Sequence, residues 1–227
     1  MGKQGFEKLF DLRDRVAIVT GGSRGIGRSL AEGYALAGAK VVVASRKFEA
    51  CQETLVTIEK AGGTALAVHN AANALAQPFR QMTPEAWEKS LAVNLRGPVF
   101  LTQYCLPGLD QSAHASVINV SSAGAFLFSA YTHMYAAAKT GLLAYVRSCA
   151  AELAPRIRVN GLAPGTIDTD MVRNNTPEMQ SKMAAAALLR RAAHPDEVVG
   201  IALYLASDAL SFVTGATFSI DGGLVPR

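Results

Sequence analysis

The sequence lacks most features that mark secreted, metal-binding, nucleic-acid-binding and membrane-spanning proteins. It has only three cysteines, an odd number without a paired-cysteine motif, which argues against a disulfide framework or a zinc site. The net charge is a mild +4 and the basic residues form no run, so nucleic acid is not an expected partner. No segment is apolar for long enough to cross a membrane or to act as a signal peptide. We therefore expect a cytoplasmic protein that binds no metal.

An alternation of strands and helices is what the chain does contain. Half of its 227 residues are hydrophobic, enough for a sizeable core in one α/β domain over residues 1–227. Short apolar runs predict strands at 15–20, 40–45, 64–68, 115–120, 156–162 and 216–220. Helices are expected at about 25–37, 48–61, from Thr83–Pro84 past Phe100, at about 132–154, and from Pro177 and Pro195. The order indicates a parallel sheet covered by helices on both faces.

A glycine-rich turn lies between the first expected strand and the first helix. The stretch TGGSRGIG places three glycines there. Gly21 would permit the tight turn, Gly25 would let the backbone approach a pyrophosphate, and Gly27 would let helix and strand pack closely. Free N–H groups at the helix start favour an anion. In this context the turn predicts a dinucleotide site rather than an ordinary βα turn, with candidate residues Gly21, Ser23, Arg24, Gly25, Ile26 and Gly27.

The end of the second expected strand indicates which dinucleotide binds. NAD-binding proteins usually carry an Asp or Glu there, which accepts hydrogen bonds from the ribose. This chain has Ser45, Arg46 and Lys47 instead. With Arg24, these groups suit a 2′-phosphate, because arginine binds phosphate in a forked geometry. We therefore expect NADP(H), with NAD(H) as the second option; the alternative is that Arg46 and Lys47 belong to a solvated helix start.

A tyrosine and a lysine stand one helical turn apart in the helix expected at about 132–154. Tyr135 and Lys139 share a face, with only alanines between them. An ammonium near a phenol favours the phenolate, which lowers the pKa of the tyrosine and makes it a proton donor or acceptor near neutral pH. Ser122 follows the strand at 115–120, at the edge where a parallel sheet meets its ligand. The alternative is an amphipathic helix with a surface lysine.

These motifs occur in the order of a known family. The stretches TGGSRGIG, NAA, VNLRGPVF, INVSSAGAF, YAAAK and RVNGLAPGTIDTDM follow one another between about residues 12 and 223. The chain closely resembles the short-chain dehydrogenase/reductase family of the ordinary type. The resemblance implies one Rossmann-type doubly wound sheet with helices on both faces, in an oxidoreductase of the NADP-preferring kind.

The resemblance also implies a role for each matching residue. Ser122 would stabilise the substrate oxygen, Tyr135 would be the general acid–base, and Lys139 would lower the pKa of the tyrosine and bind the ribose. Asn94 would kink its helix and hold a water linked to Lys139. The other matches would line the cofactor cleft: Asn70, Ala71, Pro164, Gly165, Ile167 and Thr169.

The chain departs from the family at one place. The family has a further helix and a central strand before its Asn-Asn-Ala-Gly motif, whereas here only His69 separates Val68 from Asn70. About two dozen residues are therefore expected to be absent, from the length that a helix and a strand need. The central fourth strand would be lost with them, which would leave unpaired backbone groups and a gap in the core.

The substrate is not readable from the sequence. We expect a small carbonyl or alcohol; a 3-oxoacyl thioester of fatty acid metabolism is one alternative, and a non-catalytic NADP(H)-binding regulatory protein is another. Apolar residues near the site suit a substrate pocket and the core equally: Phe126, Phe128, Met134 and Met171. By resemblance, residues 170–195 would form a mobile substrate lid, and the chain would form a homo-oligomer, a tetramer or dimer.

Overall fold

A parallel sheet runs through the middle of the molecule. The computed structural model describes residues 2, 8–45, 63–69, 72–128 and 130–226. In this part of the chain the sheet has six strands in the order β2-β1-β3-β4-β5-β6, and every neighbouring pair is parallel. The strands are β1 (Asp14–Thr20), β2 (Lys40–Ala44), β3 (Gly63–His69), β4 (Ser116–Val120), β5 (Arg158–Pro164) and β6 (Thr217–Ile220). All six expected strands are thus confirmed, with small shifts at their ends.

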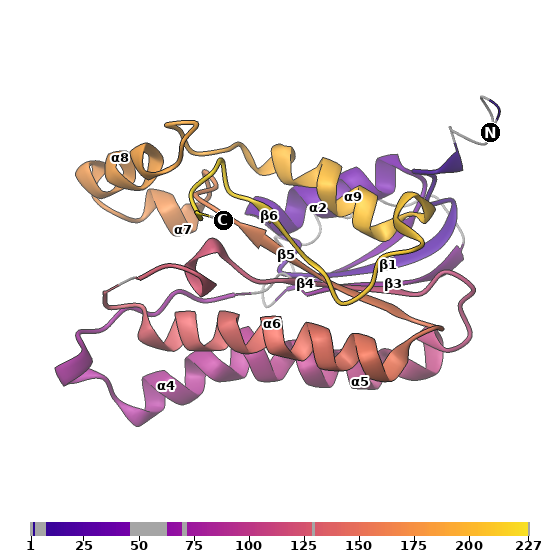
Figure 1. Ribbon diagram of the computed structural model, residues 1–227, viewed down its shortest axis with the longest axis horizontal. Helices are drawn as coiled ribbons and strands as arrows, with labels where there is room; N and C mark the ends of the chain where they lie inside the picture. Colours follow the sequence, from indigo (N-terminus) through magenta and orange to yellow (C-terminus); the bar gives the residue numbers. More distant parts are fainter. Residues whose placement is uncertain (1, 3–7, 46–62, 70–71, 129, 227) are drawn as a thin grey trace.

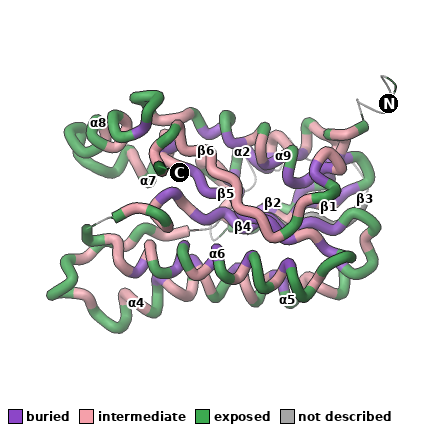
Figure 2. Tube along the Cα trace, in the orientation of Figure 1, coloured by how far each residue is buried: buried purple, intermediate pink, exposed green. Residues whose placement is uncertain are grey.

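Helices cover both faces of the sheet (Figure 1), as the sequence pattern predicts. On one face lie α2 (Gly25–Leu36) and α9 (Val199–Ala206), and on the other α4 (Pro84–Leu91), α5 (Gly97–Leu109) and α6 (His133–Leu153). Successive residues of β4 face opposite layers, because strand side chains alternate. Val117 joins the core with α5 and α6, whereas Ile118 joins the core with α2 and α9. Figure 2 shows the strands β4 and β5 largely buried between the two layers.

The strand β3 occupies the centre of the sheet. It pairs with β1 from Asp14↔Gly63 to Val19↔Val68, and with β4 from Leu66↔Ser116 to His69↔Asn119. The expectation that the central strand is missing is therefore wrong. Residues 63–69 occupy this position because they form parallel ladders with β1 on one side and β4 on the other. Once β3 lies between β1 and β4, no gap remains at this position of the sheet.

The expected long helix after Thr83 is confirmed, but it is built from three parts. The Thr83 hydroxyl caps α4 by accepting a hydrogen bond from the Ala86 N–H at 3.2 Å. A π-helical stretch, η2 (Ala92–Arg96), then joins α4 to α5. Such stretches are rare and often lie at functional sites. This one contains the candidate Asn94.

Shorter elements complete the carboxyl end of the sheet and the C-terminal half. They are η1 (Phe79–Gln81), η3 (Ala123–Ala125), α7 (Asp170–Arg173), α8 (Pro177–Ala186), η4 (Pro195–Val198) and η5 (Asp208–Leu210). The helical starts at Pro177 and Pro195 are confirmed. The helix expected at 48–61 lies outside the described residues. None of the helices in the described ranges has both the length and the apolar character that a bilayer crossing requires.

Candidate active site

The candidate residues gather at one edge of the sheet. Because all the strands are parallel, their carboxyl ends meet at the same edge, where open α/β sheets bind their ligands. The glycine-rich turn follows β1, Ser45 follows β2, Ser122 follows β4 by two residues, and Gly165 follows β5. From β1 the chain first adds β2 on one side of β1 and then β3 on the other side. The strand order therefore reverses between β1 and β3. Ligand binding is expected at this point.

The last residue of β4 and the two residues that follow it are joined to helix α6. The Lys139 ammonium donates a 2.8 Å hydrogen bond to the Val120 carbonyl oxygen, and the Ser121 hydroxyl donates one of 2.8 Å to the Lys139 carbonyl oxygen. The Ser122 hydroxyl hydrogen-bonds the Tyr135 hydroxyl. Residues that lie far apart in the sequence are thereby brought together, as the Ser–Tyr–Lys hypothesis requires.

Burial controls the ionisation of this group. Burial lowers the pKa of Lys139 to about 7, since its side chain is almost entirely removed from solvent. Burial also raises the pKa of Tyr135, and its hydrogen bond with Ser122 offsets part of that rise. The expected lowering of the tyrosine pKa by Lys139 is therefore not what this structure shows. The Lys139 Nζ lies 5.6 Å from the centre of the Tyr135 ring and is directed at Val120.

Asn94 is completely buried in the π-helical stretch and binds the loop after β3. Its amide nitrogen lies 2.9 Å from the Asn73 carbonyl oxygen, and its Oδ1 accepts a 3.1 Å hydrogen bond from the Asn73 N–H. The same nitrogen lies 3.0 Å from the Ser90 carbonyl oxygen. The Asn94 side chain therefore attaches the backbone at Asn73 to the helix. The candidates Asn70 and Ala71 lie outside the described residues.

The glycine-rich turn touches the segment after β5. Gly25 has a φ of 52°, in the left-handed region, and a Cβ added there would lie 3.0 Å from the Thr169 Cγ2. Helix α2 begins at Gly25, and its first turn contains no acidic residue. The backbone N–H groups of this turn, and the absence of a side chain at its glycines, fit a phosphate, as the dinucleotide hypothesis requires.

The two sides of this turn have different neighbours. The hydroxyl oxygens of Ser23 and Ser45 lie 2.9 Å apart, which brings the turn to the end of β2. The Arg24 guanidinium lies on another side, with its Nη1 2.9 Å from the Asp170 Oδ2. It is thus bonded to the first residue of α7 and not to Ser45. The candidates Arg46 and Lys47 lie outside the described residues.

The segment Pro164–Thr169 runs close to the end of β6. The Gly165 N–H donates to the Ile220 carbonyl oxygen at 3.0 Å, and a Cβ on Gly165 would lie 2.7 Å from the Asp221 Cα. Only glycine fits this approach. Ile167 is buried and forms an isolated bridge with Ala193. These contacts hold the segment at the carboxyl edge of the sheet, where the family resemblance places the cofactor cleft.

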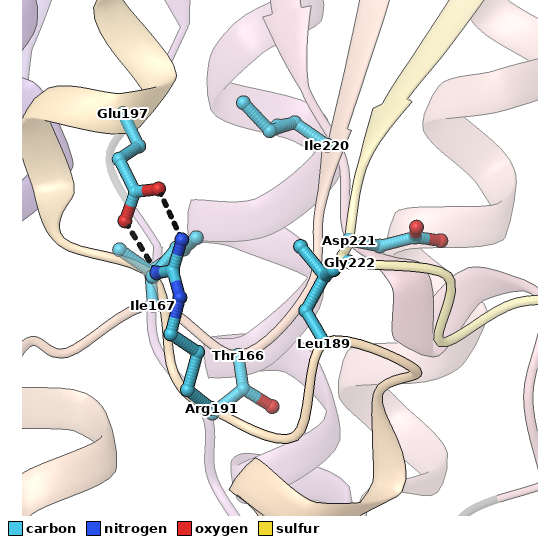
Figure 3. A pocket seen from close by; sticks show the side chains of 9 residues that line it. Thr166, Ile167, Leu189, Arg191, Glu197, Ile220, Asp221 and Gly222 are labelled. Carbon is cyan, nitrogen blue, oxygen red and sulfur yellow. Dashed lines mark hydrogen bonds and ion pairs between the residues drawn. The ribbon is translucent and has the colours of Figure 1, made fainter.

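Beside this segment lies a hollow that Figure 3 shows from close by. Arg191 is directed at the carboxylate of Glu197, with two contacts of 2.7 Å, while Asp221 points away from that pair. The Arg191 hydrogen bond is the main reason that the pKa of Glu197 is lowered to about 2. Arg191 is the one cation among the described residues that line this hollow, and Glu197 already neutralises it. The hollow therefore suits a phosphate less well than the glycine-rich turn does.

A second hollow is almost wholly apolar and lies beyond the η3 turn. The Ser122 hydroxyl accepts a 3.0 Å hydrogen bond from the Gly124 N–H at the start of this turn. The three residues that follow this turn line the hollow together with residues near the C-terminus. The lining is Phe126, Leu127, Phe128, Thr217, Val225 and Pro226. Of the four apolar candidates, Phe126 and Phe128 line it, Met134 is fully buried in the core, and Met171 is an exposed residue of α7.

Several residues of this edge were missed by sequence reasoning. Asn73 stands three residues beyond Asn70, shortly after an expected strand, and this position could have indicated that it lies at the carboxyl edge of the sheet. Ser121 and Asp170 carried no such signal, because their partners Lys139 and Arg24 are distant in sequence.

Two family models match the chain. The model described as "short chain dehydrogenase" matches residues 15–69, and the model described as "Enoyl-(Acyl carrier protein) reductase" matches residues 47–225. Together they include the glycine-rich turn, Ser122, Tyr135 and Lys139.

The chain belongs to the short-chain dehydrogenase/reductase family. It is 35% identical to short chain dehydrogenase/reductase astE of Aspergillus oryzae, over 97% of this chain and 98% of that protein. It is 32% identical to dehydrogenase/reductase SDR family member 4 of Homo sapiens, over 100% and 93% of the two chains. It is 31% identical to the 3-oxoacyl-[acyl-carrier-protein] reductase FabG of Aquifex aeolicus, over 94% and 98%. Family members are oxidoreductases that act on CH–OH groups, and the chain is an enzyme of this class.

Solved structures of the short-chain dehydrogenase/reductase family have the same fold. A dehydrogenase/reductase from Mycobacterium marinum superposes with a TM-score of 0.90 at 29% identity, over 97% of this chain and 99% of that one. The NADP complex of Pseudomonas aeruginosa RhlG gives 0.88 at 29% identity, over 96% and 98%. The alignment with the human relative has 259 positions for the 227 residues here, so at least 32 positions have no counterpart in this chain. The chain is thus shorter than its relatives, as the sequence indicated.

Proposed function

We propose that this enzyme transfers a hydride between NADP(H) and a ketone or secondary alcohol, with Tyr135 as the general acid–base. The observation that carries the proposal is the joining of Val120, Ser121 and Ser122 to Tyr135 and Lys139 at the carboxyl edge of the sheet. It supports the proposal because a proton donor and a second hydroxyl lie side by side where a ligand enters.

The residues divide the work of carbonyl reduction. When bound, NADPH supplies the hydride that adds to the carbonyl carbon. Tyr135 gives its hydroxyl proton to the carbonyl oxygen, and the Ser122 hydroxyl donates a hydrogen bond to the same oxygen. Lys139, whose ammonium is held by the Val120 carbonyl oxygen, would bind the cofactor ribose, because burial and Ser122 rather than Lys139 set the pKa of Tyr135. In the direction of alcohol oxidation, the Tyr135 phenolate takes the proton back.

The turn after β1 and the end of β2 support NADP(H) over NAD(H). Ser45 directly follows β2, and its hydroxyl lies beside that of Ser23, where an NAD-binding protein would have a carboxylate. Arg24 adds a positive charge to the same turn, and Arg46 and Lys47 follow Ser45 in the sequence. A similar structure contains NADP. Residues of the turn and of Pro164–Thr169 would hold the cofactor, with Lys139 on its ribose.

The apolar hollow beyond η3 suits the substrate's non-reacting part. Among the described residues that line it, Thr217 is the one polar residue and none carries a charge. Binding there would favour apolar ketones over charged sugar acids, because burial of apolar surface stabilises the complex. A 3-oxoacyl thioester has a suitable chain, and one relative is named for that reaction. Residues 170–195, which contain α7 and α8, would close over the substrate as a lid.

The proposal is tested by following NADPH oxidation with a panel of ketones that includes a 3-oxoacyl thioester. Tyr135→Phe should lower kcat by roughly 10²–10⁴-fold, the usual contribution of general acid–base catalysis. Tyr131→Phe is the matched control, because that tyrosine is more than half exposed and has no lysine one turn on. Equal turnover by the wild type and Tyr135→Phe would contradict the proposal. NADPH binding without turnover of any ketone would favour a regulatory protein instead.

Self-association is also part of the proposed function. The outer face of the α4–η2–α5 helix carries the exposed apolar side chains Val93, Phe100 and Tyr104, the last of them 78% exposed. We propose that such a face is covered in a homodimer or homotetramer. Sedimentation of the wild type and of Tyr104→Glu tests this, since the added charge should shift the wild-type oligomer toward smaller species.

A further inference from the structure

An ion pair joins the two walls of the dinucleotide cleft. The Arg24 Nη1 lies 2.9 Å from the Asp170 Oδ2, which links the turn after β1 to the start of α7 after β5. These segments also touch at the next residues, since a Cβ on Gly25 would lie 3.0 Å from the Thr169 side chain. The arginine side chain is 71% exposed and the aspartate 50% exposed, so the pair is accessible to a ligand.

The ion pair holds Arg24 away from the corner where the adenosine ribose is expected. Ser23, the neighbouring residue, reaches Ser45 at the end of β2 with its hydroxyl. The Arg24 guanidinium turns instead to Asp170 on the opposite wall. A 2′-phosphate beside Ser45 would attract the same guanidinium, because arginine binds phosphate through two parallel N–H bonds. Asp170 and the phosphate are thus two anions within reach of one flexible cation.

We propose that Asp170 is a specificity-determining residue that competes with the 2′-phosphate of NADP(H) for Arg24. This inference rests on the proposed function. The cost of breaking the ion pair is subtracted from the affinity for NADP(H) but not from that for NAD(H), which has no 2′-phosphate. Asp170 therefore reduces the ratio of the affinity for NADP(H) to the affinity for NAD(H). NADP(H) still binds more tightly, because an arginine that binds a phosphate dianion through two N–H groups makes a stronger contact than one with a single carboxylate oxygen.

The test measures dissociation constants for NADPH and NADH by fluorescence titration. An exposed ion pair shifts an equilibrium by roughly 1.4- to 5-fold. Asp170→Asn should therefore tighten NADPH binding about two- to fivefold at low salt, whereas NADH binding should change by less than about twofold. The gain should shrink as salt is raised, because ions screen exposed charges.

Two further variants separate competition from simple repulsion between Asp170 and the cofactor phosphates. In an Arg24→Ala background, competition predicts that Asp170→Asn no longer tightens NADPH binding, whereas repulsion predicts a gain as large as before. Asp110→Asn is the matched control: the Asp110 Oδ1 lies 3.8 Å from the Arg156 Nε at similar exposure, outside the segments that would hold the cofactor. It should leave NADPH affinity unchanged.

The outcomes distinguish this inference from the proposed function. If the wild type binds neither dinucleotide, the proposed function fails and the inference fails with it. If the wild type binds NADPH but Asp170→Asn binds it equally well, the inference alone is overturned. An equal gain in Asp110→Asn, or a full gain in the Arg24→Ala background, overturns it as well.

Discussion

The Lys139 ammonium lies 2.8 Å from the carbonyl oxygen of Val120, and the lysine is only 2% exposed. A long cationic side chain is rarely buried this deeply without an anionic partner. Burial lowers its pKa to about 7, so this group changes charge in the range where the enzyme is proposed to work. The carbonyl of one strand end thus anchors a lysine whose charge is sensitive to pH.

Stability should depend on pH through Lys139. Its pKa is about 7 in the folded protein against an ordinary 10.5, so between these values the unfolded chain binds more protons than the folded one. The free energy of unfolding should therefore rise with pH through this window, by about 2 kcal/mol between pH 7 and 9. Urea denaturation at both pH values checks this. Lys139→Met should lose the rise, and a rise that persists in that variant would contradict the assignment.

Replacement of the buried Asn94 should destabilise the enzyme more than replacement of its partner. Asn94→Ala leaves the Asn73 N–H and carbonyl oxygen without their hydrogen bonds and should cost about 1–3 kcal/mol. Asn73→Ala keeps those backbone bonds and removes only side-chain contacts, so it should cost less. Chemical denaturation of both variants tests the order. A larger loss for Asn73→Ala would show that Asn94 is not the anchor of this loop.

Two glycine replacements should act in opposite directions. Gly25→Ala should destabilise by about 1–2 kcal/mol, because its φ of 52° strains any residue with a Cβ and Thr169 lies 3.0 Å from the new atom. It should also weaken dinucleotide binding. Gly200→Ala lies in α9 with nothing within 4 Å and should stabilise by up to about 1 kcal/mol. Melting temperatures of both variants check the prediction, and similar shifts in the two would refute it.

At the opposite edge of the sheet, Asp208 should stabilise the fold at neutral pH. Burial tends to raise its pKa, but the hydrogen bond and charge of Arg15, with a smaller effect of His114, hold it below its ordinary 3.8. Asp208→Asn removes the anionic partner of the buried Arg15, which should cost about 1–2 kcal/mol once solvent screening of the half-exposed aspartate is allowed for.

The pH dependence of this effect has a definite sign. Because the folded pKa is lowered, the contribution is complete above the ordinary pKa of 3.8 and is lost as pH falls through the folded value. Unfolding of the wild type and Asp208→Asn should therefore differ at pH 7 and converge in acid. A difference that stays constant down to low pH would point to lost packing rather than lost charge.

Local patterns in the sequence determined the strands, the helix starts and the one-turn spacing of Tyr135 and Lys139. The reason is that capping, strand alternation and helical periodicity depend on neighbouring residues alone. The same patterns located the glycine-rich turn between β1 and α2. The family followed from the order of such motifs, each of which is local in itself.

Only the tertiary structure decided which strand lies beside β1, how deeply Lys139 is buried and which anion pairs with Arg24. Sequence reasoning left the central position of the sheet empty, although β3 fills it, because strand order depends on contacts between distant segments. It expected Lys139 to act first on Tyr135, but burial sets the ionisation of both residues. Desolvation and ion pairing depend on everything packed around a group, and a linear pattern does not contain that information.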